Sequence, residues 1–313
     1  MTEPQTETQS FPGVDFVYVD VFASTPLTGA PLTLVTDADG LTDVQMRAVA
    51  REFNQSETTF VQRSPVPGAT RRLRSFTPTG EEVFGAGHNA LGAWLWLASS
   101  GRLGPAGQDA TFTQHIGEDV LPVHVRHDGG RTVVAMEQSP PVFGAVVADR
   151  AGLAAALGLR EDDLVPDRPA QVVNTGAGHL LVPVRDRAAV DRAAPDAARL
   201  TAALREVGGE GCYLYTGDTI DQEATAYARF FNPAMGIWED PATGTAAGPL
   251  AAQLVAGGVV VPAGTGEATV VVEQGHSMGR PSRITVTVAG SRIQVSGSGL
   301  VVARGTIALP AVS

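Results

Sequence analysis

The sequence predicts an α+β fold of two pseudo-symmetric halves, each a barrel-like curved β-sheet wrapped around a central α-helix. Short runs rich in Val, Thr and aromatic residues recur along most of the 313 residues and are typical of strands. Two helical segments, about 88–99 and 246–256, are apolar on nearly every side, so we expect them to be buried all round. Each follows several strands and a glycine-containing turn, which indicates that the order of elements is repeated once.

The expected boundaries follow from this repeat. Residues 1–12 are polar and acidic and are interpreted as a disordered tail. Residues 13–127 form the N-terminal half, which a last strand at about 300–313 completes. Residues 128–299 form the C-terminal half. The strands do not alternate with helices as they do in a doubly wound parallel sheet, so that fold class is not expected.

The N-terminal half is expected to contain one amphipathic helix and one buried helix. Segment 16–23 alternates and is rich in Val, and 30–35 reads as its partner strand. Residues 41–54 form the amphipathic helix, with Thr42 as a candidate cap and a buried face made by Met46, Val49, Ala50 and Phe53. Two more strands precede the buried helix, at 56–63 and 71–78.

The C-terminal half repeats this pattern with more strands. A short helix is expected at 151–159, and the buried helix at about 246–256. The strands expected in this half and in the final segment are 132–138, 171–176, 179–184, 212–217, 224–233, 268–275, 283–290, 292–297 and 299–309.

Composition excludes several classes of partner. Lys and Arg number 22 and Asp and Glu 33, so the net charge of −11 argues against nucleic acid or an anionic membrane as the main partner. Cys212 is the one cysteine, which rules out a disulfide framework within the chain and a zinc cluster of cysteines. No signal peptide and no run of 18 apolar residues is present, so a soluble cytoplasmic protein is expected. No metal is expected, because the remaining histidines lack ligand spacing: His115, His124, His127, His179 and His276.

The turn before the first buried helix partly matches a dinucleotide-binding motif. Gly85-x-Gly87-x-x-Ala90 has the glycine spacing, but the acidic residue that would hold a ribose should follow the next strand, and Asp109 precedes it. A different function suits the same geometry. The N-terminus of a helix offers unpaired N–H groups and a positive dipole end, which bind a carboxylate without a lysine. Two such N-termini, at Gly87–His88 and Gly244–Thr245, would allow an acidic protein to bind an anion.

Five segments carry a resemblance to a known family: 19–35, 46–61, 76–92, 228–254 and 274–284. In this order they resemble the PhzF-like phenazine-biosynthesis family, which has the diaminopimelate-epimerase-like fold with an active site between two barrel-like halves. The resemblance spans about residues 15–285. It implies a homodimer and a small-molecule carboxylate substrate, with no cofactor, and a place in phenazine-type secondary (antibiotic) metabolism.

The resemblance also implies roles for particular residues. In the best-studied activity of the family, a dihydro-3-hydroxyanthranilate is isomerised as a proton moves between ring carbons and an enol becomes a ketone. Glu57 takes the place of the acid–base group, with His88 and Asp240 as its polar partners. From the residues alone, Glu57 would be an ordinary exposed glutamate at a strand edge and Asp240 a turn residue. The resemblance further implies that Gly87, Gly244 and Thr245 bind the substrate carboxylate through backbone and hydroxyl donors.

The chain departs from the family pattern around the expected pocket. Ala30 stands where the family has an asparagine, so one substrate contact is lost. Asn89 stands where the family usually has proline, and Thr245 where it usually has serine. No role is assigned to Arg280, which lies in a turn between two strands.

These departures leave two alternatives to the isomerase. One is a non-catalytic small-molecule-binding member of the same fold, which the loss at Ala30 permits, and the other is an epimerase-like relative acting on another substrate. A racemase with two thiols is not favoured, because no cysteine stands near Gly87 or Thr245.

Overall fold

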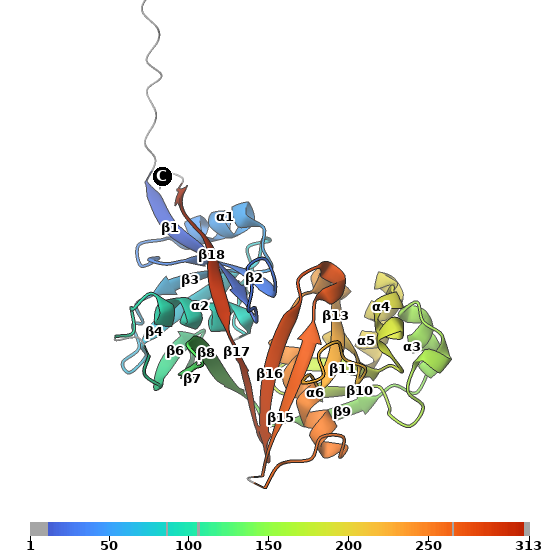
Figure 1. Cartoon of the computed structure of the whole chain (residues 1–313). Coiled ribbons are helices and arrows are strands. Elements are labelled where there is room, and N and C mark those ends of the chain that lie inside the picture. Colours follow the sequence, from blue (N-terminus) through green and yellow to red (C-terminus); the bar gives the residue numbers. More distant parts are fainter. Residues whose placement is uncertain (1–11, 86, 105–106, 265, 310–313) are drawn as a thin grey trace, which may run out of the picture.

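The computed structural model describes residues 12–85, 87–104, 107–264 and 266–309, so nearly all of the expected tail lies outside the described residues. The chain forms two lobes joined through one continuous 18-stranded sheet (Figure 1). Each lobe curves its part of the sheet around one buried helix. The α+β architecture predicted from the sequence is therefore confirmed.

Neighbouring strands of the first lobe follow the order β18-β1-β2-β3-β4-β6-β7-β8. The last strand of the chain thus lies beside the first. The short β5 pairs with β4 alone. The bounds are β1 (Gly13–Val21), β2 (Ala30–Val35), β3 (Thr58–Gln62), β4 (Arg71–Phe76), β5 (Glu82–Val83), β6 (Ala110–Ile116), β7 (Asp119–Asp128), β8 (Arg131–Gln138) and β18 (Gly299–Ala308).

Neighbouring strands of the second lobe follow the order β9-β10-β11-β12-β13-β15-β16-β17, and β14 pairs with β13. β17 also pairs with β8, which joins the lobes. The bounds are β9 (Val142–Val146), β10 (Gln171–Asn174), β11 (Gly178–Pro183), β12 (Gly211–Thr216), β13 (Ala226–Asn232), β14 (Ile237–Asp240), β15 (Glu267–Gln274), β16 (Ser282–Ala289) and β17 (Arg292–Gly297).

The two lobes are pseudo-symmetric in their strand pairing. Counted from β18 in one lobe and from β9 in the other, successive neighbours are antiparallel, antiparallel, parallel, antiparallel, parallel, antiparallel and antiparallel in both. In this correspondence, β4, β5 and the central helix that follows them are equivalent to β13, β14 and the central helix of the second lobe. The duplication inferred from the order of elements is thus visible in the hydrogen-bond pattern.

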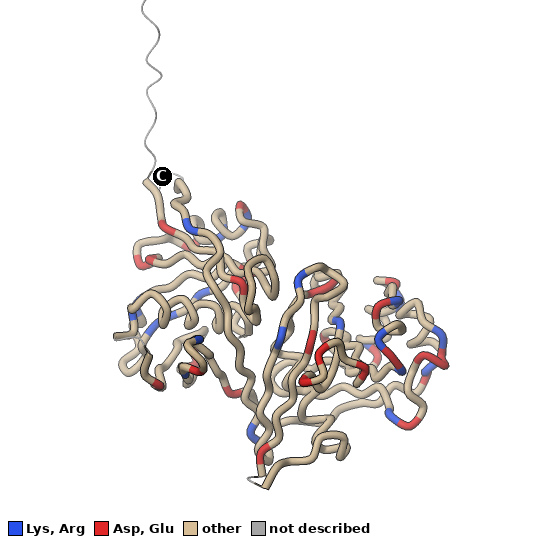
Figure 2. The backbone as a smooth tube through the Cα atoms, in the orientation of Figure 1, with Lys and Arg blue, Asp and Glu red and all other residues tan. Residues whose placement is uncertain are grey.

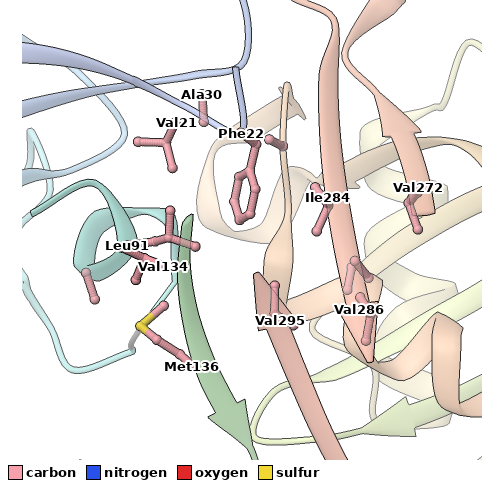
Figure 3. Close-up of a cluster of buried hydrophobic side chains, with 14 of the residues drawn as sticks. Val21, Phe22, Ala30, Leu91, Val134, Met136, Val272, Ile284, Val286 and Val295 are labelled. Atoms are coloured by element: carbon pink, nitrogen blue, oxygen red, sulfur yellow. The ribbon is translucent and has the colours of Figure 1, made fainter. Parts of the chain in front are cut away.

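The central helices are α2 (His88–Ser99) and α6 (Gly244–Ala256). Both were predicted as helices apolar on all sides, and both are buried over most of their length. Trp94 of α2 is fully buried, and its indole N–H donates to Gln114 Oε1 at 2.9 Å. One hydrophobic cluster includes side chains of both helices, and Figure 3 shows Phe22 between the side chains of the two lobes.

Two of the outer helices were predicted from the sequence, and two were not. α1 (Asp43–Phe53) begins after Thr42, which caps it as predicted, and the structure adds that Gln45 completes a capping box. α3 (Arg150–Ala156) matches a predicted helix. No element was predicted for α4 (Arg187–Arg192) or α5 (Ala197–Val207), nor for the single 3-10 turns, which are η1 (Glu161–Asp163), η2 (Pro233–Met235) and η3 (His276–Met278).

Positions of charged residues are dense around α3, α4 and α5 (Figure 2). Within the residues that the structure describes, no helix has the length and the apolar character needed to cross a membrane.

Candidate active site

The candidate site lies where the N-termini of α2 and α6 meet the ends of nearby strands. Glu57 stands directly before β3, and His88 is the first residue of α2. Asp240 is the last residue of β14, four residues before α6 begins at Gly244. Because Asp240 lies within electrostatic range of both His88 and Glu57, the structure brings together the predicted acid–base residue Glu57 and its two predicted polar partners.

A repeated pair of residues positions the two helix N-termini. Arg74 of β4 forms a bidentate ion pair with Glu82 of β5, at 2.6 and 2.7 Å. Arg229 of β13 forms the same pair with Glu239 of β14, at 2.8 Å for both contacts. Each arginine also lies over the phenylalanine two residues later in its strand. In both lobes a glycine at the start of the helix follows five residues after the glutamate, so the two hairpins deliver equivalent positions to the site.

Glu57 and His88 lie close together in the first lobe. His88 Nε2 lies 3.2 Å from Glu57 Oε2 and 3.4 Å from Ser56 Oγ. Glu57 Oε2 is shielded from solvent, yet it has no well-aligned hydrogen bond among the described residues. The contact with His88 Nε2 is therefore short but lacks the alignment of a hydrogen bond. An unoccupied carboxylate lone pair in a shielded position is suited to accept a proton from a carbon acid.

Asp240 is the most perturbed acid of the site. Burial raises its pKa from the usual 3.8 to about 6, although His88 and a hydrogen bond from Thr243 favour the ionised form. Glu57, a nearby like charge, adds to the rise. A carboxyl group with this pKa is partly protonated close to neutral pH, so it can donate or accept a hydrogen bond to a substrate.

A buried network fixes the backbone around Asp240. Thr243 Oγ1 donates to Asp240 Oδ2, and Gln274 Nε2 donates to Asp240 O at 2.6 Å and to Thr243 Oγ1 at 3.0 Å. Gln274 Oε1 accepts from Thr243 N at 3.1 Å and from Tyr213 Oη at 2.8 Å. Tyr213 is fully buried, and burial together with the charge of Asp240 raises its pKa well above its usual value, so it stays a donor.

The N-terminus of α6 offers donors for an anion. The backbone N–H groups of Gly244 and Thr245 have no hydrogen-bond partner among the described residues, and the helix dipole adds positive potential there. The Thr245 hydroxyl lies 3.2 Å from Nε2 of His179, a buried side chain of β11. Burial lowers the pKa of His179 to about 4, so its imidazole is neutral.

The N-terminus of α2 differs from that of α6. The Gly87 N–H already donates to Asn89 Oδ1 at 2.8 Å, and Asn89 Nδ2 donates to Gly85 O and to Ser75 Oγ, both at 3.0 Å. A ligand would have to displace Asn89 to reach the Gly87 amide. This side chain therefore makes the two helix N-termini unequal.

The other predicted positions have plain structural surroundings. Ala30 opens β2 and is 1% exposed, packed in the cluster that also contains Phe22. Cys212 is a buried free thiol whose pKa is raised by burial, so it is a core residue. No cluster of three His, Cys, Asp or Glu side chains suited to a metal occurs in the described part of the chain.

Sequence reasoning missed His179, Tyr213 and Gln274. His179 was noted only as a histidine without metal-ligand spacing, and its contact with Thr245 joins residues 66 positions apart. One signal was available for the scaffold of the site. The motif Arg-x-Phe-x-Pro occurs at 74–78 and again at 229–233, each time ahead of a central helix.

Comparison with known proteins decides the family. A family model described as phenazine biosynthesis-like protein matches residues 19–305. The chain belongs to this family. The fold and the family suggested by the five short segments are therefore confirmed.

Relatives and solved structures agree with this assignment. An uncharacterised isomerase of Escherichia coli is 34% identical over 291 residues, which is 91% of this chain and 95% of that protein. The trans-2,3-dihydro-3-hydroxyanthranilate isomerase of Pseudomonas chlororaphis is 33% identical over 302 residues, 94% and 99% of the two chains. The solved structure of a PhzF-family phenazine biosynthesis protein of Bacillus anthracis has a TM-score of 0.86 at 28% identity and covers 95% of this chain and 99% of its own. The chain is accordingly an enzyme of the isomerase class.

Proposed function

We propose that this protein is a cofactor-independent isomerase that moves a proton within a small cyclic carboxylate. The reaction would resemble the isomerisation for which the Pseudomonas chlororaphis relative is named. The observation that carries the proposal is the shielded Glu57 Oε2, free of a directed hydrogen bond and 3.2 Å from His88 Nε2. The part-buried Asp240, whose pKa is raised, lies near both.

The proposed reaction is a proton transfer between two carbons. Glu57 takes a proton from a ring carbon, and the electron pair of the broken C–H bond moves into the ring. The resulting carboxylic acid returns its proton to a second ring carbon and leaves an enol. Transfer of the enol O–H proton to carbon then gives the ketone, so atoms and charge balance. His88 is placed to stabilise the charge that changes on Glu57, and Asp240 to bind a hydroxyl or amine of the substrate.

The substrate carboxylate is assigned to α6. The free N–H groups of Gly244 and Thr245 and the Thr245 hydroxyl form the donor set, which suits an anion in a protein of net charge −11. His179 is neutral, and its Nδ1 has no partner in the described structure. The tautomer with the proton on Nε2 is therefore favoured, because it leaves a bare nitrogen unpaired at Nδ1 and not an N–H group. In that tautomer His179 donates to Thr245 Oγ1, so the Thr245 proton is free to point at the carboxylate.

The test is turnover of trans-2,3-dihydro-3-hydroxyanthranilate, followed by ultraviolet absorbance, by the wild-type protein and by Glu57→Gln. Gln keeps the shape but cannot take a proton, so we expect the rate to fall by at least about 10³-fold. Glu52→Gln, on the exposed side of α1, is the matched control and should keep the full rate. If Glu57→Gln is as active as wild type, Glu57 is not the base.

A binding function without turnover is the second candidate, favoured by the apolar Ala30 where the family supplies an amide. Isothermal titration of the same compound distinguishes the two. Binding without a change in absorbance would assign the protein to this class. A homodimer is part of the main proposal, and light scattering should then give twice the chain mass of 32.4 kDa.

A further inference from the structure

Arg280 belongs to the second lobe but binds the first. It lies between η3 and β16, and its guanidinium reaches the segment that joins β1 to β2. Nη2 donates to Asp20 Oδ1 at 2.7 Å and to Thr28 O at 3.0 Å, while Nε donates to Gly29 O at 2.8 Å. The planar fork of an arginine suits this divergent set of acceptors, and a lysine would not reproduce it.

Asp20 is the charge that Arg280 neutralises. Its side chain is 2% exposed, and its second oxygen accepts from Leu27 N at 2.6 Å. A buried carboxylate left without its cation is strongly destabilised, so this contact is costly to break. Backbone hydrogen bonds also join the lobes here: Gly29 N donates to Pro281 O at 3.0 Å, and Arg283 N donates to Phe22 O at 3.1 Å.

The segment held by Arg280 has a conformation that needs support. Phe22 and Leu27 have φ values of 58° and 65°, in the left-handed region that residues with a Cβ rarely adopt. Gly29 has φ 65°, and a Cβ there would lie 2.2 Å from Val21 O. Such conformations persist only where the surroundings enforce them. The contacts from the second lobe supply part of those surroundings, and the bond from Leu27 N to Asp20 Oδ2 supplies support from the first lobe.

This conformation carries Phe22 onto the first turn of α6. The Phe22 ring extends between the lobes (Figure 3), and its Cζ lies 3.4 Å from where a Cβ of Gly244 would stand. On its other side, a Cβ at Gly297 would lie 2.3 Å from Cδ1 of the same ring, so the ring fills its space. Gly244 belongs to the donor set assigned to the carboxylate.

We infer that Arg280 is a positioning residue for the reaction: it clamps segment 20–29 of the first lobe onto the second and thereby seats Phe22 against the N-terminus of α6. The clamp sets the spacing between the Glu57–His88 wall and the Gly244–Thr245 wall. The inference about the reaction rests on the proposed isomerase function, whereas the clamp itself is tested without substrate.

The first experiment compares Arg280→Gln and Arg280→Lys with Arg283→Lys. Arg283 is a nearby arginine whose side chain pairs with Asp221 and Glu223 of its own lobe, which makes it the matched control. We expect kcat/KM to fall at least about tenfold for both Arg280 variants, with a higher KM and a lower kcat together, because both walls shift. Arg283→Lys should stay within about twofold. Unchanged kcat and KM in Arg280→Gln would overturn the inference.

The second experiment is hydrogen–deuterium exchange, which needs no turnover. The amides of Ala246 and Ala247 donate to Thr243 O at 3.1 and 3.0 Å and report on the first turn of α6. Loss of the clamp should speed their exchange at least about fivefold, together with that of segment 22–29. Faster exchange in segment 22–29 alone would show a local ion pair and refute the clamp. An inactive wild type with the full exchange response would count against the proposed function and not against the clamp.

Replacing Arg280 alone leaves Asp20 as a buried unpaired charge, which can prevent folding. The double variant Asp20→Asn with Arg280→Gln removes both charges and keeps polar groups in place, so it is expected to fold. It still lacks the fork to Thr28 and Gly29, and therefore should show the same faster exchange at Ala246 and Ala247. Wild-type exchange in this double variant would overturn the inference.

Discussion

Replacing Asp240 by asparagine should stabilise the protein, and the gain should grow with pH. The carboxyl group has a pKa of about 6 in the folded protein against a usual value of 3.8. The unfolded chain therefore ionises this group first, and the folded state loses relative stability as pH rises from about 4 to about 6. Asparagine does not ionise, so the variant does not undergo this loss.

The size of the effect follows from the two pKa values. The difference between 6 and 3.8 is 2.2 pH units, and at about 1.36 kcal/mol per unit it corresponds to about 3 kcal/mol. An unfolding entropy of about 2.1 cal/mol/K per residue gives about 0.66 kcal/mol/K for 313 residues, so the shift in Tm is roughly 4 to 5 °C. A change in the hydrogen bond from Thr243 would add a constant offset that cancels between pH values.

Differential scanning calorimetry of both proteins from pH 4 to pH 8 measures the difference. The Tm of Asp240→Asn relative to wild type should rise across pH 4 to 7 and then level off. Turnover should fall at every pH, because the titrating group near the substrate is gone. A difference in Tm that is the same at pH 4 and pH 8 would refute the assignment of a buried, raised-pKa carboxyl at this position.

Three further substitutions test the scaffold of the site. His179→Gln should make the protein less sensitive to acid unfolding. Burial lowers the pKa of His179 from 6.5 to about 4, so the wild-type protein loses stability as pH falls through this range. The Tm of the variant relative to wild type should therefore rise toward low pH and not toward high pH. Arg229→Met leaves Glu239 buried without its cation and should cost about 3 to 5 kcal/mol in urea unfolding; a cost below about 1 kcal/mol would show that the pair is dispensable. Gly92→Ala in α2 places a Cβ 2.6 Å from Leu32 Cδ2 and should cost about 1 to 3 kcal/mol, whereas Gly40→Ala, with nothing within 4 Å, should be close to neutral.

The sequence predicted the elements whose patterns are local. Helices α2 and α6 are recognisable because they are apolar on nearly every side, and α1 because Thr42 is a candidate cap ahead of an amphipathic face. Helices α4 and α5 were not predicted. Helix α4 has six residues and is packed on β12 and β13, which a local pattern does not reveal. Helix α5 carried a local signal that was overlooked, because Asp196 caps it, Leu200 and Leu204 form its buried face and Gly208 ends it.

The site divides along the same line. The roles of Glu57, His88 and Asp240 came from family resemblance, since nothing in the residues alone separates Glu57 from an ordinary surface glutamate. Contacts that arise from folding were out of reach. Asp20 and Arg280 are 260 positions apart, and the effect of Asn89 on the Gly87 amide depends on a backbone turn that its sequence does not specify.

The repeated hairpins show how a symmetric scaffold supports an asymmetric reaction. Counted from Glu82 and Glu239, His88 and Thr245 are equivalent positions, and so are Val83 and Asp240. Inverting a stereocentre calls for a base on each face of the substrate, and equivalent groups on the two helices would supply them. Here one lobe supplies an imidazole next to Glu57, and the other supplies unpaired N–H groups and a hydroxyl at the start of α6. That division agrees with the proposed transfer of a proton between two carbons on one face of a substrate, and it argues against the two-base inversion that an epimerase carries out.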